Sequence, residues 1–347
     1  MSQEKHLFSP ITLNNLEIKN RIAMPPMCQY SAHKKDGVAN NWHFVHYASR
    51  AVGGTGLIIV EMTNVEPAGR ISDRCLGLWD DAQIQPLKRI VDECHKYGSK
   101  MAIQIGHAGR KAEDAPEPVS ASDVRFSSSY KQPRALSNQE VKEMVQKYKR
   151  AVERAVEAGF DAIEIHGAHG YLIHQFHSPL TNLRDDEYGK DKTLFGREVL
   201  RAAKEVMPEG MPLIFRLSAA EYVEGGYGLD YAIEIAKEYM KEGIDVFHIT
   251  SGGEGPIGSG GRPGVHAGYQ VPMAREIKKA TGLPAIAVGK LSDFEMANSV
   301  IGNEDADMVA IGRGMLRNPN WALEASFAIR RDTEIPYQLE RAFPQQK

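Results

Sequence analysis

Residues 161–177 read DAIEIHGAHGYLIHQFH, and the interpretation of the chain starts from this stretch. It opens as a short strand with apolar residues at Ala162, Ile163 and Ile165, and the pattern stops at His166. Four histidines, at positions 166, 169, 174 and 177, then fall close together beside Tyr171. Imidazoles are costly in an apolar core and well tolerated at a wet surface, so this density after a strand indicates a functional site. Histidines that cap turns or fill gaps in a core are the alternative.

Outside this stretch, short β-branched runs alternate with longer helical patterns along the whole chain. Strands are expected at Arg21–Met24, Leu57–Glu61, Met101–Ile105, Ala162–Ile165, Leu213–Leu217, Val246–Ile249, Ala285–Val288 and Met308–Ile311. Helices are expected near 41–52, 82–97, 138–158, 194–206, 229–242, 269–280, 292–301 and 319–330. This alternation predicts one α/β domain over residues 1–347, a (β/α)8 TIM barrel. A doubly wound open sheet is the alternative, but the chain shows no division into two nucleotide-binding halves.

The connecting segments are unequal in length. Those that follow the expected strands are long: 25–40, 62–80, 106–137, 166–193, 218–228 and 250–268. The segments that join a helix to the next strand are short. In a barrel the long loops gather at the carboxyl-terminal face, where TIM-barrel active sites lie, so the asymmetry predicts an enzyme.

Composition narrows the class of protein. The chain has 42 basic and 45 acidic residues, so its net charge is 42 − 45 = −3. It has no basic stripe that would favour nucleic-acid binding. No apolar run approaches the roughly 20 residues of a membrane helix, and the start lacks the apolar core of a signal peptide. Cys28, Cys75 and Cys94 are too few and too scattered for a disulfide framework or a zinc ribbon. A cytoplasmic protein that binds neither nucleic acid nor membrane is therefore expected; a small-molecule substrate is implied only by the family resemblance described below.

Several polar residues follow the expected strands and are candidates for ligand contacts. Cys28 and Tyr30 follow a loop that Pro25 and Pro26 stiffen. Gln104 can donate and accept at once, as an imide edge requires, and Arg216 would meet an anion or an electron-rich ring. Turn packing or a structural salt bridge is the alternative for each. Lys111 reads as a solvated residue.

Glycines mark a second group of candidates. The sequences AVGK at Ala287–Lys290 and AIGRG at Ala310–Gly314 end the last two expected strands, where barrels often bind phosphate through backbone amides. Arg313 would add positive charge. The sequence GEGPIG at 253–258 has the residue pattern of a dinucleotide-binding motif. The motif requires a helix at this point, which Pro256 and the glycine-rich run after it prevent. It is interpreted as a flexible loop at the mouth.

Together these motifs resemble the old yellow enzyme family of flavin-dependent ene reductases, in its thermophilic-like bacterial branch. The resemblance covers nearly the whole chain. It depends on LFSPITLNNLEIKNRIAMPPMCQY, WHFVHYASRA, QIGHAGRK, EIHGAHGYLIHQFHSPLTNLRDDEYG, the late glycines and the terminal YQLERAF.

The resemblance implies a non-covalent FMN that is reduced by NADPH or NADH and passes hydride to an activated alkene. It places these residues around FMN: Pro25, Pro26, Met27, Cys28, Met62, Gln104, Arg216, Gly289, Gly312 and Arg313. His166 and His169 would hold the substrate oxygen with Tyr30, and Tyr171 would supply a proton. Cys28 would tune the flavin potential. Pro25 stands where the family has serine or alanine, and Met62 where it has a small residue.

Two other functions stay open from the residues alone. A metal-dependent barrel hydrolase could use His166, His169 and Glu164, although no carboxylate-rich second shell is evident and no metal is expected. A flavin carrier without catalysis would need neither Tyr171 nor Cys28.

The tail 331–347 lies beyond the expected barrel. Its apolar residues Tyr337, Leu339 and Phe343 are unusual for a disordered segment, so it is expected to pack on a surface, of its own barrel or of another copy. The resemblance implies that Arg341 enters the active site of a neighbouring subunit, in a homodimer or a tetramer of dimers.

Overall fold

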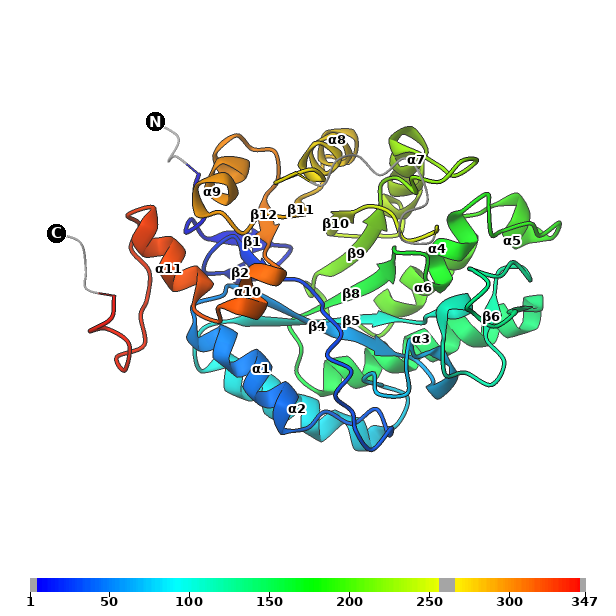
Figure 1. Cartoon of the computed structure of the whole chain (residues 1–347), viewed down its shortest axis with the longest axis horizontal. Helices are drawn as coiled ribbons and strands as arrows, with labels where there is room; N and C mark the ends of the chain where they lie inside the picture. Colours follow the sequence, from blue (N-terminus) through cyan, green and yellow to red (C-terminus); the bar gives the residue numbers. More distant parts are fainter. Residues whose placement is uncertain (1–4, 256–265, 344–347) are drawn as a thin grey trace.

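The computed structural model describes residues 5–255 and 266–343, so most of the loop expected at 250–268 lies outside it, including the interpreted flexible segment after Gly255. Within these ranges the core is a closed barrel of parallel strands (Figure 1). In order around the barrel they are β3 (Ile22–Met24), β4 (Leu57–Asn64), β5 (Lys100–Gly106), β8 (Ala162–Gly167), β9 (Leu213–Ser218), β10 (Val246–Thr250), β11 (Ala285–Val288) and β12 (Met308–Ala310). The predicted TIM barrel is confirmed.

Alternation along each strand separates two apolar layers. In β8, Ile163 and Ile165 face outward and pack in the large cluster shared with the helices, whereas Ala162 belongs to a smaller cluster inside the barrel. Toward the carboxyl ends the inward positions become polar. Glu164 on β8 bonds to His248 on β10, and these strands are not neighbours, so the bond crosses the interior. The barrel therefore has an apolar floor beneath a polar upper layer.

Eight helices follow the strands at the predicted positions, each within two residues of its expected ends. They are α1 (Asn41–Val52), α2 (Ile84–His95), α3 (Asn138–Glu157), α6 (Leu194–Lys204), α7 (Leu229–Met240), α8 (Val271–Thr281), α9 (Phe294–Gly302) and α11 (Trp321–Ala328). Ser137 is the N-cap of α3 and forms a capping box with Glu140, which fixes where this helix begins.

Several short elements were not predicted, because they are too brief to show a periodic pattern. They are β1 (Ile11–Leu13), β2 (Leu16–Ile18), β6 (Val119–Ser120), β7 (Arg134–Ala135), α4 (Leu172–His177), α5 (Glu187–Lys190), α10 (Arg313–Arg317) and the 3-10 turns η1 (Pro67–Gly69), η2 (Asp81–Gln83) and η3 (Gly109–Lys111). The β1–β2 hairpin matters most. Its Leu13 and Ile18 join the inner cluster, so the hairpin covers the amino-terminal end of the barrel.

The tail after α11 lies at this same end. Residues 334–338 border a groove with Lys19, Gly54 and Gly98, which precede β3, β4 and β5. Tyr337 is 78% exposed there, and Arg341 is exposed as well. No helix in the described part of the chain is long and apolar enough to span a bilayer.

Candidate active site

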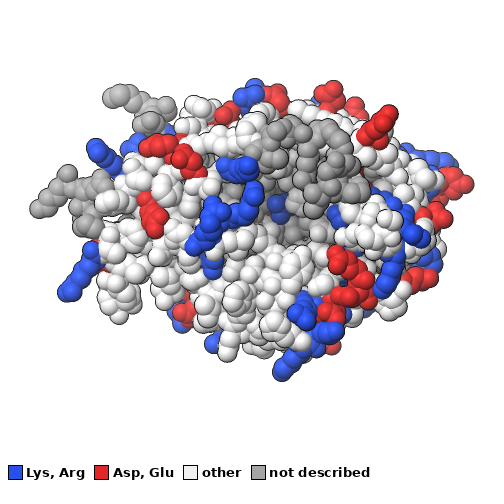
Figure 2. Space-filling view, in the orientation of Figure 1, with Lys and Arg blue, Asp and Glu red and all other residues white. Residues whose placement is uncertain are grey.

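A cavity of about 630 Å³ opens at the carboxyl ends of the strands. Seven of the ten residues predicted to contact the flavin line it: Pro25, Pro26, Met27, Arg216, Gly289, Gly312 and Arg313. Four lining residues are basic (Arg216, Lys290, Arg313 and Arg317) and one is acidic. Figure 2 shows Lys and Arg side chains gathered beside a hollow on this face. The cavity therefore suits an anionic ligand.

Two glycines shape the phosphate side of this cavity. Gly289 has φ +117°, and a Cβ there would lie 2.8 Å from Oε1 of Gln270. A Cβ on Gly312 would instead project beside Met27 and Pro25, which also line the cavity. Backbone amides can approach a phosphate closely only where side chains are absent. These residues fit the phosphate of a mononucleotide.

The polar upper layer lies beside the cavity. Glu164 accepts a hydrogen bond from Nε2 of Gln104 (2.7 Å), and its other oxygen lies 2.7 Å from Nδ1 of His248. Because the amide NH₂ of Gln104 is used in this way, its carbonyl oxygen is left to accept from an imide N–H. Arg216 is buried, and its Nε has no hydrogen-bond partner among the described residues. A buried unpaired donor is costly, which fits a missing electron-rich ligand at this point.

The predicted histidines and Tyr171 come together as expected. The ring of His166 lies 5.3 Å from that of His169 and 5.1 Å from that of Tyr171. Burial, and secondly the charge of Arg216, lowers the pKa of both histidines well below its ordinary value, so both are neutral at pH 7. The backbone N–H of Ala168 donates to Nδ1 of His166 (3.3 Å). The ring proton of His166 is thus on Nε2, where it can donate to a substrate oxygen.

His169 is held differently. Its backbone has φ +59°, an uncommon value for a residue with a side chain, and its Nε2 lies 3.0 Å from Oγ1 of Thr250. When Thr250 donates to this nitrogen, the ring proton of His169 stays on Nδ1 and can serve the same substrate oxygen as His166. Thr250 is in turn 3.2 Å from the Gln270 amide. Sequence reasoning missed both partners, which lie in a distant segment.

Lys111 holds the loop that contains His169, so its interpretation as a solvated residue was wrong. Its Nζ donates to the carbonyl oxygens of His169 (2.8 Å) and Gly253 (3.0 Å), and it lies over the ring of Tyr171 at 5.0 Å. Burial lowers the pKa of Lys111 to about 8. The only signal in the sequence was its position shortly after a strand.

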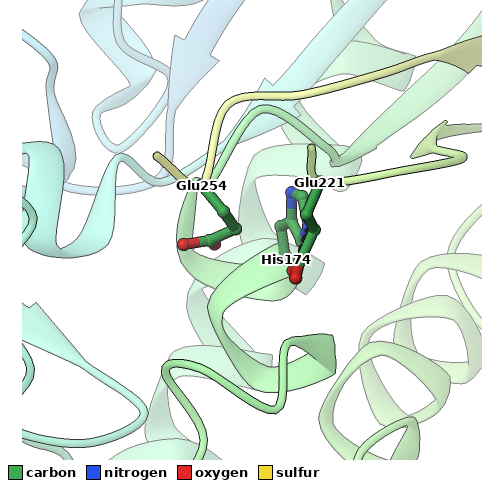
Figure 3. Close-up of side chains that lie close together, drawn as sticks. All are labelled: His174, Glu221 and Glu254. Carbon is green, nitrogen blue, oxygen red and sulfur yellow. Dashed lines mark hydrogen bonds and ion pairs between the residues drawn. The ribbon is translucent and has the colours of Figure 1, made fainter. Parts of the chain in front are cut away.

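A buried cluster beneath the loop tests the metal alternative. Ligand atoms of His174, Glu221 and Glu254 lie within 4.8 Å of one another (Figure 3). However, Nδ1 of His174 accepts from the backbone N–H of Gly170 (2.8 Å), so Nε2 carries the proton and cannot bind a metal. That Nε2–H instead faces Glu221 at 3.1 Å, and Glu254 is already paired with Arg110. The cluster supports the loop and does not fit a metal.

The residues of the predicted metal site also have other partners. Glu164 is occupied by Gln104 and His248, and the one group of ligating residues that the described chain brings together does not include His166 or His169. The geometry therefore gives the hydrolase alternative no support.

The remaining predicted residues lie in three places. Cys28 and Tyr171 pack against a small cluster that contains Met62 and Cys75. Tyr30 is 44% exposed at the rim of the mouth. Arg341 lies at the other end of the barrel from the mouth of its own chain. The structure thus brings the residues predicted to contact cofactor and substrate to one face, except Arg341.

Sequence comparison agrees with this arrangement. Residues 6–331 match the NADH:flavin oxidoreductase / NADH oxidase family. An NADPH dehydrogenase of Listeria innocua is 45% identical over 340 residues, covering 97% of this chain and 99% of that protein. An NADPH dehydrogenase of Bacillus subtilis (strain 168) is 41% identical over 348 residues, covering 98% and 99%. The chain belongs to the old yellow enzyme family.

Solved structures of this family superpose on the barrel. Morphinone reductase has a TM-score of 0.81 at 27% identity, covering 97% of this chain and 93% of that one. An old yellow enzyme homologue from Zymomonas mobilis has a TM-score of 0.80 at 26% identity, covering 98% and 97%. The resemblance in the motifs is confirmed, and with it an FMN-dependent NAD(P)H oxidoreductase.

Proposed function

We propose that the protein is an ene reductase that reduces the activated C=C bond of α,β-unsaturated carbonyl compounds. The observation that carries the proposal is the pairing of a neutral hydrogen-bond donor, Nε2–H of His166, with the phenol of Tyr171 on one side of the mouth. Reduction of an enone needs both functions: stabilisation of the carbonyl oxygen and a proton for the α-carbon.

The cavity residues would hold FMN without a covalent bond. Gln104 would face its pyrimidine edge, Arg216 the N1 and O2 side, and Gly289, Gly312 and Arg313 the phosphate. When bound, FMN supplies the hydride that NAD(P)H provides and the alkene receives. The positive charge of Arg216 favours electron density on the ring beside it.

The chain's own residues complete the reaction. His166 and His169 donate to the carbonyl oxygen, on which negative charge grows during hydride transfer. Burial raises the pKa of Tyr171 well above its ordinary value, so the phenol keeps its proton until the α-carbon needs it. Tyr30 at the rim would contact the substrate, and Cys28 would tune the flavin potential. Met62 would lie near the flavin edge.

A spectroscopic and kinetic test separates this function from its alternatives. The purified protein should be yellow, release all of its flavin as FMN on denaturation, and oxidise NADPH faster when cyclohex-2-enone is added. FAD or peptide-bound flavin would contradict the cofactor assignment. An NADPH oxidation rate that does not change when enone is added would indicate an oxidase or a flavin carrier. Loss of activity in EDTA would support the metal-dependent hydrolase instead.

We further propose that the tail 331–347 places Arg341 in the active site of a neighbouring subunit. Residues 334–338 lie at the amino-terminal end of their own barrel, and Arg341 is three residues further on, a reach of about 10 Å. A strand of five to eight residues spans roughly 17–26 Å, more than this backbone reach, which supports a role for Arg341 away from its own mouth. A two-fold homodimer, alone or paired into a tetramer, would let each subunit lend one tail and receive one.

Mixing of variants tests this exchange. Arg341→Ala should weaken substrate binding and keep FMN, and Tyr171→Phe should block protonation. Heterodimers of the two would contain one site with both defects and one site with neither. Recovered activity supports sharing between subunits. Verified subunit exchange without recovery contradicts it.

A further inference from the structure

Two cysteines from different loops meet beside the mouth. Cys28 follows β3 and Cys75 follows β4, and a backbone hydrogen bond from the N–H of Ala32 to the carbonyl oxygen of Arg74 (2.9 Å) holds the two loops side by side. Cys28 is half-buried and packs on the cluster that contains the fully buried Cys75. The loops therefore bring the two cysteines to one small packed cluster.

The surroundings of Cys75 favour its thiolate. The backbone N–H of Ser72 donates to its Sγ (3.5 Å), and Oγ of Ser72 lies 4.0 Å away. The hydrogen bond from Cys28, with those from Ser72, lowers the pKa of Cys75 to about 7, and the same contact raises the pKa of Cys28. Thiolates are the reactive form of cysteine, so the pair is poised for oxidation.

The third cysteine provides a contrast within the same chain. Cys94 is buried in α2, and burial raises its pKa to about 12. It lies outside the cluster that holds the other two. Any oxidant that acts through the mouth should leave it unchanged.

We propose that Cys28 and Cys75 are a redox-modification site that closes to a reversible disulfide on contact with a hydroperoxide. Cys28, the less buried of the two residues, attacks the peroxide as its thiolate after it passes its proton to Cys75. The O–O bond breaks, Cys28 becomes a sulfenic acid, and the departing alkoxide takes up a proton to form an alcohol. Cys75 then attacks the sulfenic sulfur, the S–S bond forms, and the expelled hydroxide leaves as water. Two thiols and one hydroperoxide thus give one disulfide, one alcohol and one water.

The disulfide would act on the flavin through Cys28. Met27 lines the cavity and Cys28 is the next residue, so the disulfide would remove a thiol at the edge of the cofactor. This consequence rests on the function proposed above, whereas the disulfide itself does not. Oxidised protein should therefore show a shifted flavin reduction potential that returns to its first value when dithiothreitol is added.

Counting thiols tests the bond directly. The holoenzyme is reduced, desalted and treated with one equivalent of tert-butyl hydroperoxide, and its thiols are counted after denaturation. The wild type, with three cysteines, should lose two thiols, and peptide mapping without reductant should link Cys28 to Cys75. Cys94→Ala, the matched control, should lose both of its thiols in the same way. Dithiothreitol should restore them.

Two variants at Cys75 decide the outcome. In Cys75→Ala, or in Cys75→Ser where the alanine variant fails to fold, Cys28 should form no internal disulfide; one equivalent of hydroperoxide should give its sulfenic acid, and a second equivalent its sulfinic acid. A wild type with no linked peptide, or with links only between subunits or to Cys94, would overturn the proposal. An intact disulfide with an unmoved flavin potential would contradict only the role of Cys28 toward FMN.

Discussion

The two sides of the barrel mouth are built by different means. Around β11 and β12 the cavity is shaped by backbone, with Gly289, where a Cβ would crowd Gln270, and Gly312, where a Cβ would lie beside Met27 and Pro25. Around β5 and β8 the mouth is shaped by side chains that hold one another, among them His166, His169 and Lys111. The first side presents amides and surface charge to a ligand, and the second presents oriented side-chain donors.

This difference fits the function proposed above. A phosphate is held equally well before and after reaction, so a rigid backbone cradle is sufficient. A carbonyl oxygen gains charge only as the reaction proceeds, and stabilising it requires donors fixed in one orientation beforehand. Substitutions on the first side should therefore affect cofactor binding, and those on the second side should affect the rate.

The largest effect is expected at His166. His166→Ala removes the donor whose proton the Ala168 amide places on Nε2, and loss of one such donor typically costs ~10²–10³ in rate. Single-turnover reduction of cyclohex-2-enone should slow by this factor, while flavin reduction by NADPH should change less. His95→Ala, on the outer helix α2, is the control and should leave both half-reactions unchanged. Equal slowing of both half-reactions would make His166 a structural residue.

Gly289→Ala should have the next largest effect, and on binding. The new Cβ would combine a strained φ of +117° with a contact of 2.8 Å to Gln270, at a cost of about 1–3 kcal/mol. FMN should therefore bind about 10–100-fold more weakly in a fluorescence titration. Gly282→Ala is the matched control, since Gly282 also has positive φ (+71°) but a Cβ there meets nothing within 4 Å. It should lower stability and leave FMN affinity intact. Equal losses of FMN in both variants would locate the effect in the backbone strain alone.

Glu164→Gln tests whether the Glu164 carboxylate orients the Gln104 amide for FMN. The variant keeps the shape of the side chain but removes the charge between Gln104 and His248, and it lets the Gln104 amide turn over. FMN affinity should fall about 10-fold, which corresponds to roughly 1.4 kcal/mol. Glu205→Gln, whose partner is the surface residue Lys149, serves as the control. Unchanged FMN affinity would mean that Gln104 is oriented without Glu164.

The smallest effect concerns Lys111 and pH. Its pKa is lowered by burial to about 8, so above pH 8 the side chain loses its charge and one of its three donated protons. His169 and Gly253 accept from Lys111, and the groups facing it are Arg110, Glu113, Glu254, Phe126 and Tyr171. Enone reduction should fall a few-fold between pH 8 and 9.5. Lys111→Arg keeps its charge and should remove that decline, and an unchanged profile in this variant would assign the decline to another group.

The sequence was informative about the elements and less so about the partners. The β-branched runs located all the barrel strands to within three residues, because inward and outward positions are both apolar over most of their length. The glycines and the histidine cluster located both sides of the mouth. Cys75, Lys111, Thr250 and Gln270 could not be found in this way, since their neighbours belong to other loops and become neighbours only after folding. The β1–β2 hairpin was missed because strands of three residues give no pattern.

The β1–β2 hairpin affects the route by which ligands reach the site. Leu13 and Ile18 cover the amino-terminal end of the barrel, so in the proposed reaction NADPH and the alkene would both enter through the mouth. Two ligands that enter through the same opening compete for it, so excess enone should slow the binding of NADPH. Steady-state rates should therefore pass through a maximum as enone concentration rises, and more NADPH should move that maximum to higher enone.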